Sequence, residues 1–513
     1  MQVMRILAAT SGLILTTTLL SVPAQATTHG IELKFLGRFA TGAVGVGASE
    51  ITAYDPVTRR VFVVNAQDGT VDVLDIRDPR RPKKVNTLVT PGANSVAVKK
   101  GIVAVAQQAA VKTDPGTVSF FMASTGHKLR EARVGALPDM VTFTPDGDTV
   151  VVANEGEPSS YCADGVDPEG SVSIVNVKRG TVKTASFRAY NGKEDLLRAK
   201  GVRIYGPNAT AAQDFEPEYI ATDKSGRTAW VSLQENNAIA IVDLKHARVK
   251  EIVPLGLKDH SKPGAGIDAS DKDGKIDIRP RPVLGMYQPD ALASFESRGR
   301  TYLVAANEGD AREYDCFAEE VRVADLTLAR LDAEVLKKDA ELGRLTVTST
   351  SPKNAAGDTT ELHALGARSI SIRSAAGALV WDSGDQLEKL VARKLPAQFN
   401  ADQENDSFDS RSDNKGPEPE GVAIGTVKGR TYAFAGLERV GGIVAYDLGN
   451  PSRPSLAGYV SSRDFTGDVE AGTAGDVGPE GVLFIPAAQS PTFRPLLVVG
   501  HEISGTTAIY EVR

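Results

Sequence analysis

The sequence lacks several features that would point to common functions. After residue 20 it has no apolar run long enough to cross a bilayer, so we expect no membrane span after processing. Positive charge is not in excess, because 58 Lys and Arg stand against 65 Asp and Glu, which argues against a nucleic-acid partner. A Gly-x-Ser-x-Gly motif is also missing, so a serine hydrolase has no support.

Aromatic residues are few and glycine is abundant. Aromatics make up 6% of the chain, whereas glycine accounts for 49 residues. This balance is typical of many tight turns between short strands.

The first residues have the pattern of a secretory signal. Arg5 supplies a positive charge, residues 6–20 an apolar region, and Ala24-Gln25-Ala26 a small-residue cleavage site. We therefore predict a signal peptide over residues 1–26, cleavage after Ala26, and a periplasmic or secreted protein. The C-terminal residues contain no hydrophobic anchor, so we expect the mature protein to be released.

Two cysteines, Cys162 and Cys316, follow the same local pattern. The first comes after Asn154-Glu155-Gly156 and the second after Asn307-Glu308-Gly309. In an oxidising compartment, a disulfide bond between these two loops is one prediction. Two separate thiols are the alternative, since a sequence does not show whether the Cα atoms approach within about 7 Å.

A repeated unit of short strands runs along the mature chain. Each unit starts with a strand that begins near an acidic or polar residue, then turns into an apolar strand ending in Asn, Gln or Glu. The first strands of the units start near residues 50, 95, 138, 216, 288, 418 and 478. This repeat predicts an all-β fold, a seven-bladed β-propeller, with residues 27–513 as a single domain. A sandwich is the alternative, whereas the units are too long for a β-helix.

Two segments lie outside the repeat. Residues 31–39 precede the first unit and resemble a strand, so we expect them to supply the outer strand of the last blade and close the ring. Residues 310–414 interrupt the fifth unit. In this excursion we predict helical insertions over residues 323–336 and 385–394. We also predict strands of the outer half of the fifth blade at residues 345–349, 367–374 and 378–382.

Acidic residues recur where the first strand of a unit begins and where the second strand ends. Antiparallel pairing brings these two places to the same edge of a sheet, so in a propeller they converge on one mouth of the channel. So many carboxylates require cations, basic partners or raised pKa values. The candidate metal ligands are Glu155, Glu218, Glu235, Asp290, Glu308, Glu420, Glu438, Glu480, His501 and Glu502.

Oxygen ligands of this kind favour a divalent cation, Ca²⁺ first and Mg²⁺ next, and His501 widens the choice to Mn²⁺, Zn²⁺ or iron. The alternative for each carboxylate is a structural role in capping backbone N–H groups or in an ion pair. Arg312 and Arg439 directly follow two of the acidic motifs, and Lys415 precedes a third. These cations could either form ion pairs with the carboxylates or bind a phosphate group.

Several long motifs resemble one known family. Residues 406–422, with Lys415-Gly416-Pro417-Glu418-Pro419-Glu420-Gly421, resemble the signature of the secreted choice-of-anchor I propeller family, and so do residues 233–238, 286–291 and 306–312. Members are often labelled alkaline-phosphatase-like or mesenchyme-specific cell surface glycoprotein-like. The resemblance implies a propeller of the seven-bladed type and an exported protein, and it loosely implies phosphatase activity.

These observations lead to three hypotheses. The first is an exported metal-dependent phosphoesterase acting on a small phosphorylated substrate, with Glu308 and Glu420 as catalytic carboxylates and Arg312 and Arg439 holding the phosphate. The second is a non-catalytic, calcium-stabilised propeller that binds an extracellular ligand or surface partner, since no distinct nucleophile is evident. The third is a lactonase-type propeller hydrolase, which would also hold Ca²⁺ in its channel.

Overall fold

The computed structural model describes residues 30–513, and the predicted signal peptide lies outside this range. Within the described residues the chain forms seven four-stranded antiparallel sheets, one five-stranded sheet and one two-stranded hairpin. The predicted all-β class is confirmed.

Each of the first four sheets consists of four consecutive strands. The first contains β2 (Thr52–Asp55), β3 (Arg60–Asn65), β4 (Thr70–Asp75) and β5 (Lys83–Val89). The second contains β6 (Ala93–Lys99), β7 (Ile102–Gln107), β8 (Pro115–Met122) and β9 (Lys128–Ala136). The third contains β10 (Pro138–Phe143), β11 (Thr149–Asn154), β12 (Ser171–Asn176) and β13 (Val182–Ser186). The fourth contains β14 (Pro217–Thr222), β15 (Thr228–Leu233), β16 (Ala238–Asp243) and β17 (Arg248–Pro254).

The other three sheets depart from this simple order in two places. The fifth joins β20 (Leu292–Ser297) and β21 (Arg300–Asn307) to β27 (Ser369–Ser374) and β28 (Leu379–Asp382) across the long excursion. The sixth contains β29 (Pro419–Val427), β30 (Arg430–Leu437), β31 (Ile443–Asp447) and β32 (Ser455–Val460). The last contains β33 (Pro479–Ile485), β34 (Leu496–His501), β35 (Thr506–Val512) and, as its outer strand, the N-terminal β1 (Leu33–Ala40).

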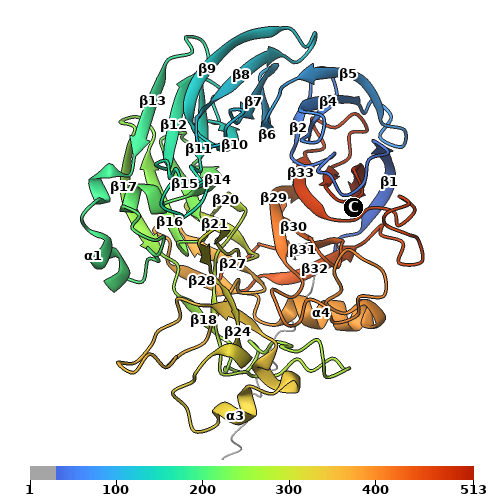
Figure 1. Ribbon diagram of the computed structural model, residues 1–513. Coiled ribbons are helices and arrows are strands. Elements are labelled where there is room, and N and C mark those ends of the chain that lie inside the picture. Colours follow the sequence, from blue (N-terminus) through green and yellow to red (C-terminus); the bar gives the residue numbers. More distant parts are fainter. Residues whose placement is uncertain (1–29) are drawn as a thin grey trace, which may run out of the picture.

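The innermost strands of the seven sheets contact one another in a closed cycle. In chain order β2, β6, β10, β14, β20, β29 and β33 are successive neighbours, and β33 contacts β2 again (Figure 1). The approach of these strands is close: a Cβ atom on Gly421 in β29 would lie 1.7 Å from the carbonyl oxygen of Glu480 in β33. Only glycine fits there. Radially arranged four-stranded sheets around a centre define a β-propeller.

Apolar side chains of neighbouring sheets pack face to face. Between the first two sheets, Phe62 and Val71 form one buried cluster with Val96, Val103 and Phe121. Similar clusters lie between the later sheets, so the hydrophobic core is divided into layers that follow the ring.

The excursion from the fifth sheet and the connection between β17 and β20 together build the additional sheet seen at the bottom of Figure 1. Its strands are β18 (Leu257–Asp259), β19 (Leu284–Met286), β24 (Glu320–Arg322), β25 (Thr346–Thr348) and β26 (His363–Ala364). The segment predicted at residues 345–349 therefore belongs to this sheet and not to the fifth blade. By contrast, β27 and β28 occupy the outer half of that blade at the predicted positions.

Helices are short throughout the described residues. The predicted helix over residues 323–336 is wrong in extent, since only a 3₁₀ turn (Val323–Asp325) and α3 (Ala333–Leu336) form there. Leu328 instead pairs with Thr359 in a β-bridge while its side chain joins the apolar cluster of the additional sheet. The predicted helix at residues 385–394 is α4 (Gln386–Lys394). The remaining helical turns are 188–190, α1 (Glu194–Ala199), α2 (Ala211–Asp214), 339–343 and 396–398.

The disulfide between Cys162 and Cys316 is formed, with 5.2 Å between the Cα atoms. It ties the connection between β11 and β12 to the hairpin of β22 (Glu313–Tyr314) and β23 (Phe317–Ala318). The Tyr161 ring packs edge-on against Phe317 beside this bond. Among the described residues, no helix is long and apolar enough to cross a membrane.

Candidate metal centre at the channel mouth

Strand pairing brings the predicted acidic positions together. In the fourth sheet Pro217 lies opposite Leu233, so Glu218 and Glu235 flank one end of the β14–β15 pair. The sixth sheet repeats this arrangement, because Pro419 lies opposite Leu437 and is followed by Glu420. All seven sheets contribute residues to one end of the channel, which we call the mouth, and the second does so through Asn94 and not through an acid.

The mouth is a hollow of about 540 Å³ lined by eleven carboxylates and only two cations, Lys415 and Arg439. A second cavity, of about 340 Å³, continues between the innermost strands and shares three of these carboxylates, Asp139, Asp290 and Glu480. The mouth therefore leads into the propeller channel and carries strong negative charge.

Most predicted ligands do line the mouth: Glu155, Glu218, Asp290, Glu308, Glu420, Glu438, Glu480 and Glu502. A carboxylate oxygen of Glu235 lies within 4.8 Å of one from Glu155 and one from Glu218. His501 is buried, with 2% of its surface exposed, and does not line the hollow. Burial lowers the pKa of its imidazole, so His501 is neutral near pH 7.

Three further acids line the mouth without having been predicted as ligands, namely Glu50, Asp139 and Asp310. Glu50 and Asp139 stand at the start of the first and third units, so the repeat pattern already contained them. Asp310 follows Glu308 by two residues, as Glu157 follows Glu155. That shared spacing was the signal that could have revealed Asp310.

Two groups of three carboxylates have oxygens close enough to share one ion. Within each group, all three oxygens lie within 4.8 Å of one another. Oxygens bound to a single Ca²⁺ at about 2.4 Å from the ion lie at most about 4.8 Å apart, so both groups match the size of this ion. The first group is Glu155, Glu218 and Glu235, and the second is Glu308, Glu418 and Glu438.

Protein cations already neutralise the second group. Lys415 Nζ lies 2.6 Å from Glu308 Oε1 and 3.3 Å from Glu418 Oε2. Arg439 pairs with Glu418 at 3.1 Å and with Glu438 at 2.9 Å, while Arg411 lies 2.6 Å from Glu418. Burial raises the pKa of Glu418, but these three cations outweigh it and lower that pKa to about 2. Three cations thus pair with these three carboxylates, although burial, and then Glu418 and Glu308, still raise the pKa of Glu438 well above its ordinary value.

Among residues 30–513, no Lys or Arg forms an ion pair with the first group. Burial, and then the neighbouring carboxylates, raise the pKa of Glu155 and of Glu218 well above the ordinary value. Glu218 and Glu235 are 7% and 5% exposed, and each has an Oε2 atom that is buried without a hydrogen-bond donor. Buried carboxylate oxygens that lack both a donor and a cation are costly, so this group fits a divalent cation.

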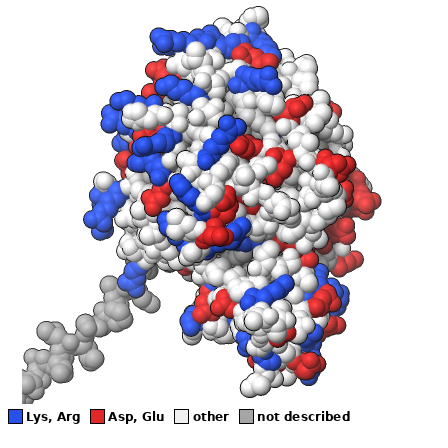
Figure 2. All heavy atoms as spheres, turned by 60° about the vertical axis from the view of Figure 1, so that its left-hand side comes forward, with Lys and Arg blue, Asp and Glu red and all other residues white. Residues whose placement is uncertain are grey.

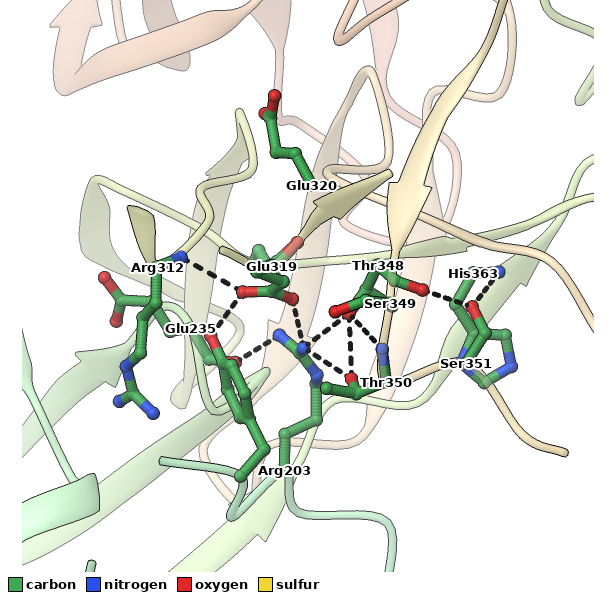
Figure 3. Close-up of polar contacts among 12 residues, drawn as sticks. Arg203, Glu235, Arg312, Glu319, Glu320, Thr348, Ser349, Thr350, Ser351 and His363 are labelled. Carbon is green, nitrogen blue, oxygen red and sulfur yellow. Dashed lines mark hydrogen bonds and ion pairs between the residues drawn. The ribbon is translucent and has the colours of Figure 1, made fainter. Parts of the chain in front are cut away.

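A network of polar contacts fixes the backbone of Glu235 on the side away from the mouth (Figure 3). Arg203 donates from Nη1 to the carbonyl oxygen of Glu235 at 2.7 Å, and its Nη2 pairs with Glu319. Glu319 also accepts from the Tyr205 hydroxyl at 2.7 Å and from the backbone N–H of Arg312 at 3.1 Å. The backbone of Glu235 is therefore fixed by a buried ion pair that its own carboxylate does not join.

Arg312, which was predicted to hold phosphate, does not line the mouth. Its guanidinium is 1% exposed and pairs with Asp214 at 3.2 Å and Glu216 at 3.1 Å. It also stacks on the Tyr205 ring, 4.5 Å from the ring centroid. The N–H groups of the Arg312 guanidinium are therefore engaged in structural ion pairs. Arg439 does line the mouth, but its pairs with Glu418 and Glu438 occupy it.

Several other carboxyls of the mouth have pKa values raised toward or above neutrality. Burial, followed by Glu502 and Asp139, raises the pKa of Glu50 to about 8. Burial, followed by Glu157, raises that of Asp139 to about 7, and burial raises that of Asp310 to about 6. Proton sharing relieves part of the repulsion around the ring.

Fold and site together define a β-propeller with an acidic channel mouth. Residues 50–451 match the family model of the choice-of-anchor I domain. The chain therefore belongs to the choice-of-anchor I domain family, as its motifs suggested.

Two relatives are similar in sequence. Gigasin-3a from Magallana gigas is 32% identical over 190 residues, which is 35% of this chain and 67% of that protein. The mesenchyme-specific cell surface glycoprotein of Strongylocentrotus purpuratus is 29% identical over 315 residues, 52% of this chain. The match spans only 40% of that glycoprotein.

Solved structures resemble the chain more distantly. The Kuenenia stuttgartiensis hydrazine synthase aligns with a TM-score of 0.47 and 12% identity over 92% of this chain and 99% of that one. The β-propeller domain of Myceliophteria thermophila Cps50 (Swd1) aligns with a TM-score of 0.42 and 11% identity, covering 94% and 100%. These two likenesses are too distant to bear on function.

Proposed function

We propose that the protein is an exported, seven-bladed β-propeller that binds one Ca²⁺ ion at its channel mouth through Glu155, Glu218 and Glu235. In this proposal the calcium-loaded mouth is a binding surface for an extracellular ligand and has no catalytic role. The seven four-stranded sheets, each with its innermost strand in the cycle, are taken as the seven blades.

One observation carries the calcium site. Three carboxylate oxygens lie within 4.8 Å of one another, and the buried Oε2 atoms of Glu218 and Glu235 have no donor. The similarly spaced group around Glu418 has Lys415, Arg411 and Arg439 as partners. An all-oxygen donor set favours Ca²⁺ over Zn²⁺ or iron, and a wide, partly hydrated mouth suits the irregular coordination of Ca²⁺ better than the strict octahedron of Mg²⁺.

The exported location has three supports. The N-terminal sequence pattern is that of a secretory signal. The sea urchin relative is named a cell surface glycoprotein, and Cys162 and Cys316 form a disulfide of the kind that persists outside the cytosol.

The phosphoesterase hypothesis is less well supported than the binding hypothesis. It needs a cation free to hold phosphate beside the metal. Arg312 is buried in ion pairs away from the mouth, and Arg439 and Lys415 are paired with carboxylates. The lactonase hypothesis needs only the metal, so a direct assay is its test.

Calcium titration of the purified mature protein tests the proposal. Isothermal calorimetry on metal-free protein is expected to show that one Ca²⁺ ion binds. The substitution Glu218→Gln is expected to abolish this binding. Glu438→Gln is the matched control, because it changes the same residue type in the compensated group. Equal loss of binding in both variants, or no binding by the parent protein, would overturn the site.

Activity assays separate the alternatives. The protein is incubated with phosphomonoesters, phosphodiesters and lactones, with and without chelator. We expect no turnover. Turnover that disappears in chelator and in Glu218→Gln would replace the binding hypothesis with an enzyme, and Glu308→Ala and Glu420→Ala would then test the predicted catalytic carboxylates.

A further inference from the structure

The face opposite the mouth carries the opposite charge. A strand of six residues spans roughly 20 Å, so the turns at the far ends of the first and third strands lie well away from the acidic hollow. In the third sheet, for example, β11 ends at the mouth with Asn154 and begins on the opposite face at Thr149.

We call the turns on this side of the first four sheets the basic face. They comprise residues 55–60, 75–83, 99–102, 122–128, 143–149, 176–182, 222–228 and 243–248. These turns hold 15 Lys and Arg against 7 Asp and Glu, although the whole chain is net negative. The mouth, by contrast, has eleven carboxylates and two cations.

The turns of successive sheets touch, so the basic face is continuous. Arg60 donates from Nη1 to the carbonyl oxygen of Ser124 at 2.8 Å, joining the first sheet to the second. A Cβ on Gly147 would lie 2.9 Å from Lys99, and a Cβ on Gly226 would lie 3.3 Å from Thr144. These contacts join the second, third and fourth sheets.

Most bases of this face are exposed and form no ion pair with a carboxylate in the described part of the chain. Exposed examples, one or two from each of the four sheets, are Arg80, Lys83, Lys99, Lys178, Arg179 and Lys245. Several of the acids, by contrast, serve the turns themselves. Asp146 accepts from the Thr144 hydroxyl at 2.7 Å, and Asp223 accepts from the backbone N–H groups of Arg227 and Thr228. Figure 2 shows Lys and Arg gathered on the left-hand and upper part of that view, with Asp and Glu more frequent toward the right.

Two large apolar side chains protrude on the same side. Val57, in the β2–β3 turn, is 84% exposed, and Phe493, in the β33–β34 connection, is 76% exposed. The Tyr54 hydroxyl donates to the carbonyl oxygen of Gln489 at 2.8 Å, which shows that these two connections are neighbours. Exposed apolar tips beside many bases are typical of protein surfaces that bind at a lipid interface.

We propose that the basic face docks on an anionic lipid surface, with its Lys and Arg near the headgroups and with Val57 and Phe493 entering the interfacial layer. A spread of bases over the turns of four sheets suits a broad surface better than a linear polyanion, and apolar tips gain nothing from a polysaccharide. The mouth then points away from the lipid. The inference does not depend on Ca²⁺ at the mouth.

Vesicle flotation tests the docking. The disulfide-bonded protein is mixed with vesicles of phosphatidylcholine alone or of phosphatidylcholine and phosphatidylglycerol in equal parts. Binding is expected only to the anionic vesicles and is expected to decrease as salt rises. Each Lys near an anionic bilayer contributes about fivefold to partitioning. A variant with four substitutions on the basic face is therefore expected to partition to anionic vesicles more than about 100-fold less strongly. Its substitutions are Lys83→Glu, Lys99→Glu, Lys178→Glu and Lys245→Glu.

A matched variant controls for net charge. Lys200→Glu, Lys338→Glu, Lys353→Glu, Lys394→Glu changes four exposed lysines outside the basic face and is expected to bind normally. Equal loss in both variants, binding to neutral vesicles, or retention on heparin without vesicle binding would each overturn the proposal. Phe493→Asn is a second, independent variant, because Asn tolerates the positive φ of 56° at that position. It is expected to weaken anionic-vesicle binding while folding normally, and unchanged binding would count against the apolar contact.

Discussion

The Nζ atom of Lys415 lies 2.6 Å from Oε1 of Glu308, across 107 residues of sequence. This ion pair and the neighbouring pair with Glu418 compensate one of the two carboxylate groups at the mouth. The other group, around Glu218, has no equivalent cation. The positions of three basic side chains therefore decide which carboxylate group is left to bind the proposed metal ion.

Removal of the Lys415 side chain should lower the stability of the fold, because two carboxylates at the mouth depend on its positive charge. Lys415→Met leaves Glu308 and Glu418 without their shared partner in a buried site, which typically costs about 3–5 kcal/mol. Chemical denaturation should show a lower free energy of unfolding. The double variant Lys415→Met, Glu308→Gln should recover part of the loss, and an unchanged midpoint in the single variant would contradict the assignment.

The stability of the metal-free protein should fall as pH rises. The pKa values of Glu50 and Asp139, at about 8 and about 7, lie above the values of about 4 in an unfolded chain, so the folded state binds more protons. The stabilisation that these two carboxyl groups give the folded state is complete at low pH. It is lost as pH rises through 7 and 8. Melting temperatures in chelator should decrease from about pH 5 to about pH 9, and Ca²⁺ should reduce that decrease.

Low pH should destabilise the protein through the protonation of a different carboxylate, Glu418. The pKa of Glu418, at about 2, is depressed by Lys415, Arg411 and Arg439 against the effect of burial. Its contribution is present above about pH 4 and is lost as pH falls toward 2. Glu418→Gln should flatten this acid limb of the melting profile and leave the alkaline limb unchanged, whereas an unaltered acid limb would contradict the prediction.

Arg203 should act on calcium affinity through Glu235. Its hydrogen bond to the Glu235 carbonyl oxygen fixes a proposed ligand from behind, and loss of such a contact commonly costs about 10–100-fold in metal affinity. We expect this loss in the double variant Arg203→Met, Glu319→Gln, which avoids stranding a buried carboxylate. Calorimetry measures the affinity, and Glu319→Gln alone is the control that keeps Arg203.

Reduction of the disulfide should cost more stability than most single contacts. Cys162 and Cys316 are 154 residues apart, and closing a loop of this size stabilises a fold by roughly 5 kcal/mol on chain-entropy grounds. The double variant Cys162→Ser, Cys316→Ser should unfold at lower denaturant concentration than the oxidised protein. If reductant shifts the midpoint of the parent protein but not of the double variant, the effect belongs to this bond.

The sequence predicted the fold because the repeat is local. Alternating apolar strands, Asp-Gly and Pro-Asp turns, and acids at fixed places in each unit need no knowledge of distant contacts. Antiparallel pairing then placed Glu218 and Glu235 on one edge. The helix expected over residues 323–336 failed because Leu328 and its neighbours are held by the additional sheet, a tertiary effect that periodicity does not contain.

Charge compensation could not be predicted in this way. Arg312 pairs with Glu216 across 96 residues, and Lys415 pairs with Glu308 across 107. Both cations are adjacent in sequence to acidic motifs, which made them attractive as phosphate ligands. Their partners Glu216 and Glu308 belong to other units of the chain, so only the folded chain reveals which carboxylates are left without a cation.

The last sheet combines β1 with β35, so Leu33 lies opposite Val512. A chain that emerges from a translocation pore N-terminus first would present β1 long before its partner is available. Both edges of the incomplete ring would stay open until the final strand arrives, which exposes unpaired backbone to other chains. If the protein is exported as proposed, the ring closes only when the last strand arrives, and truncation of only the last seven residues is expected to leave it unsealed.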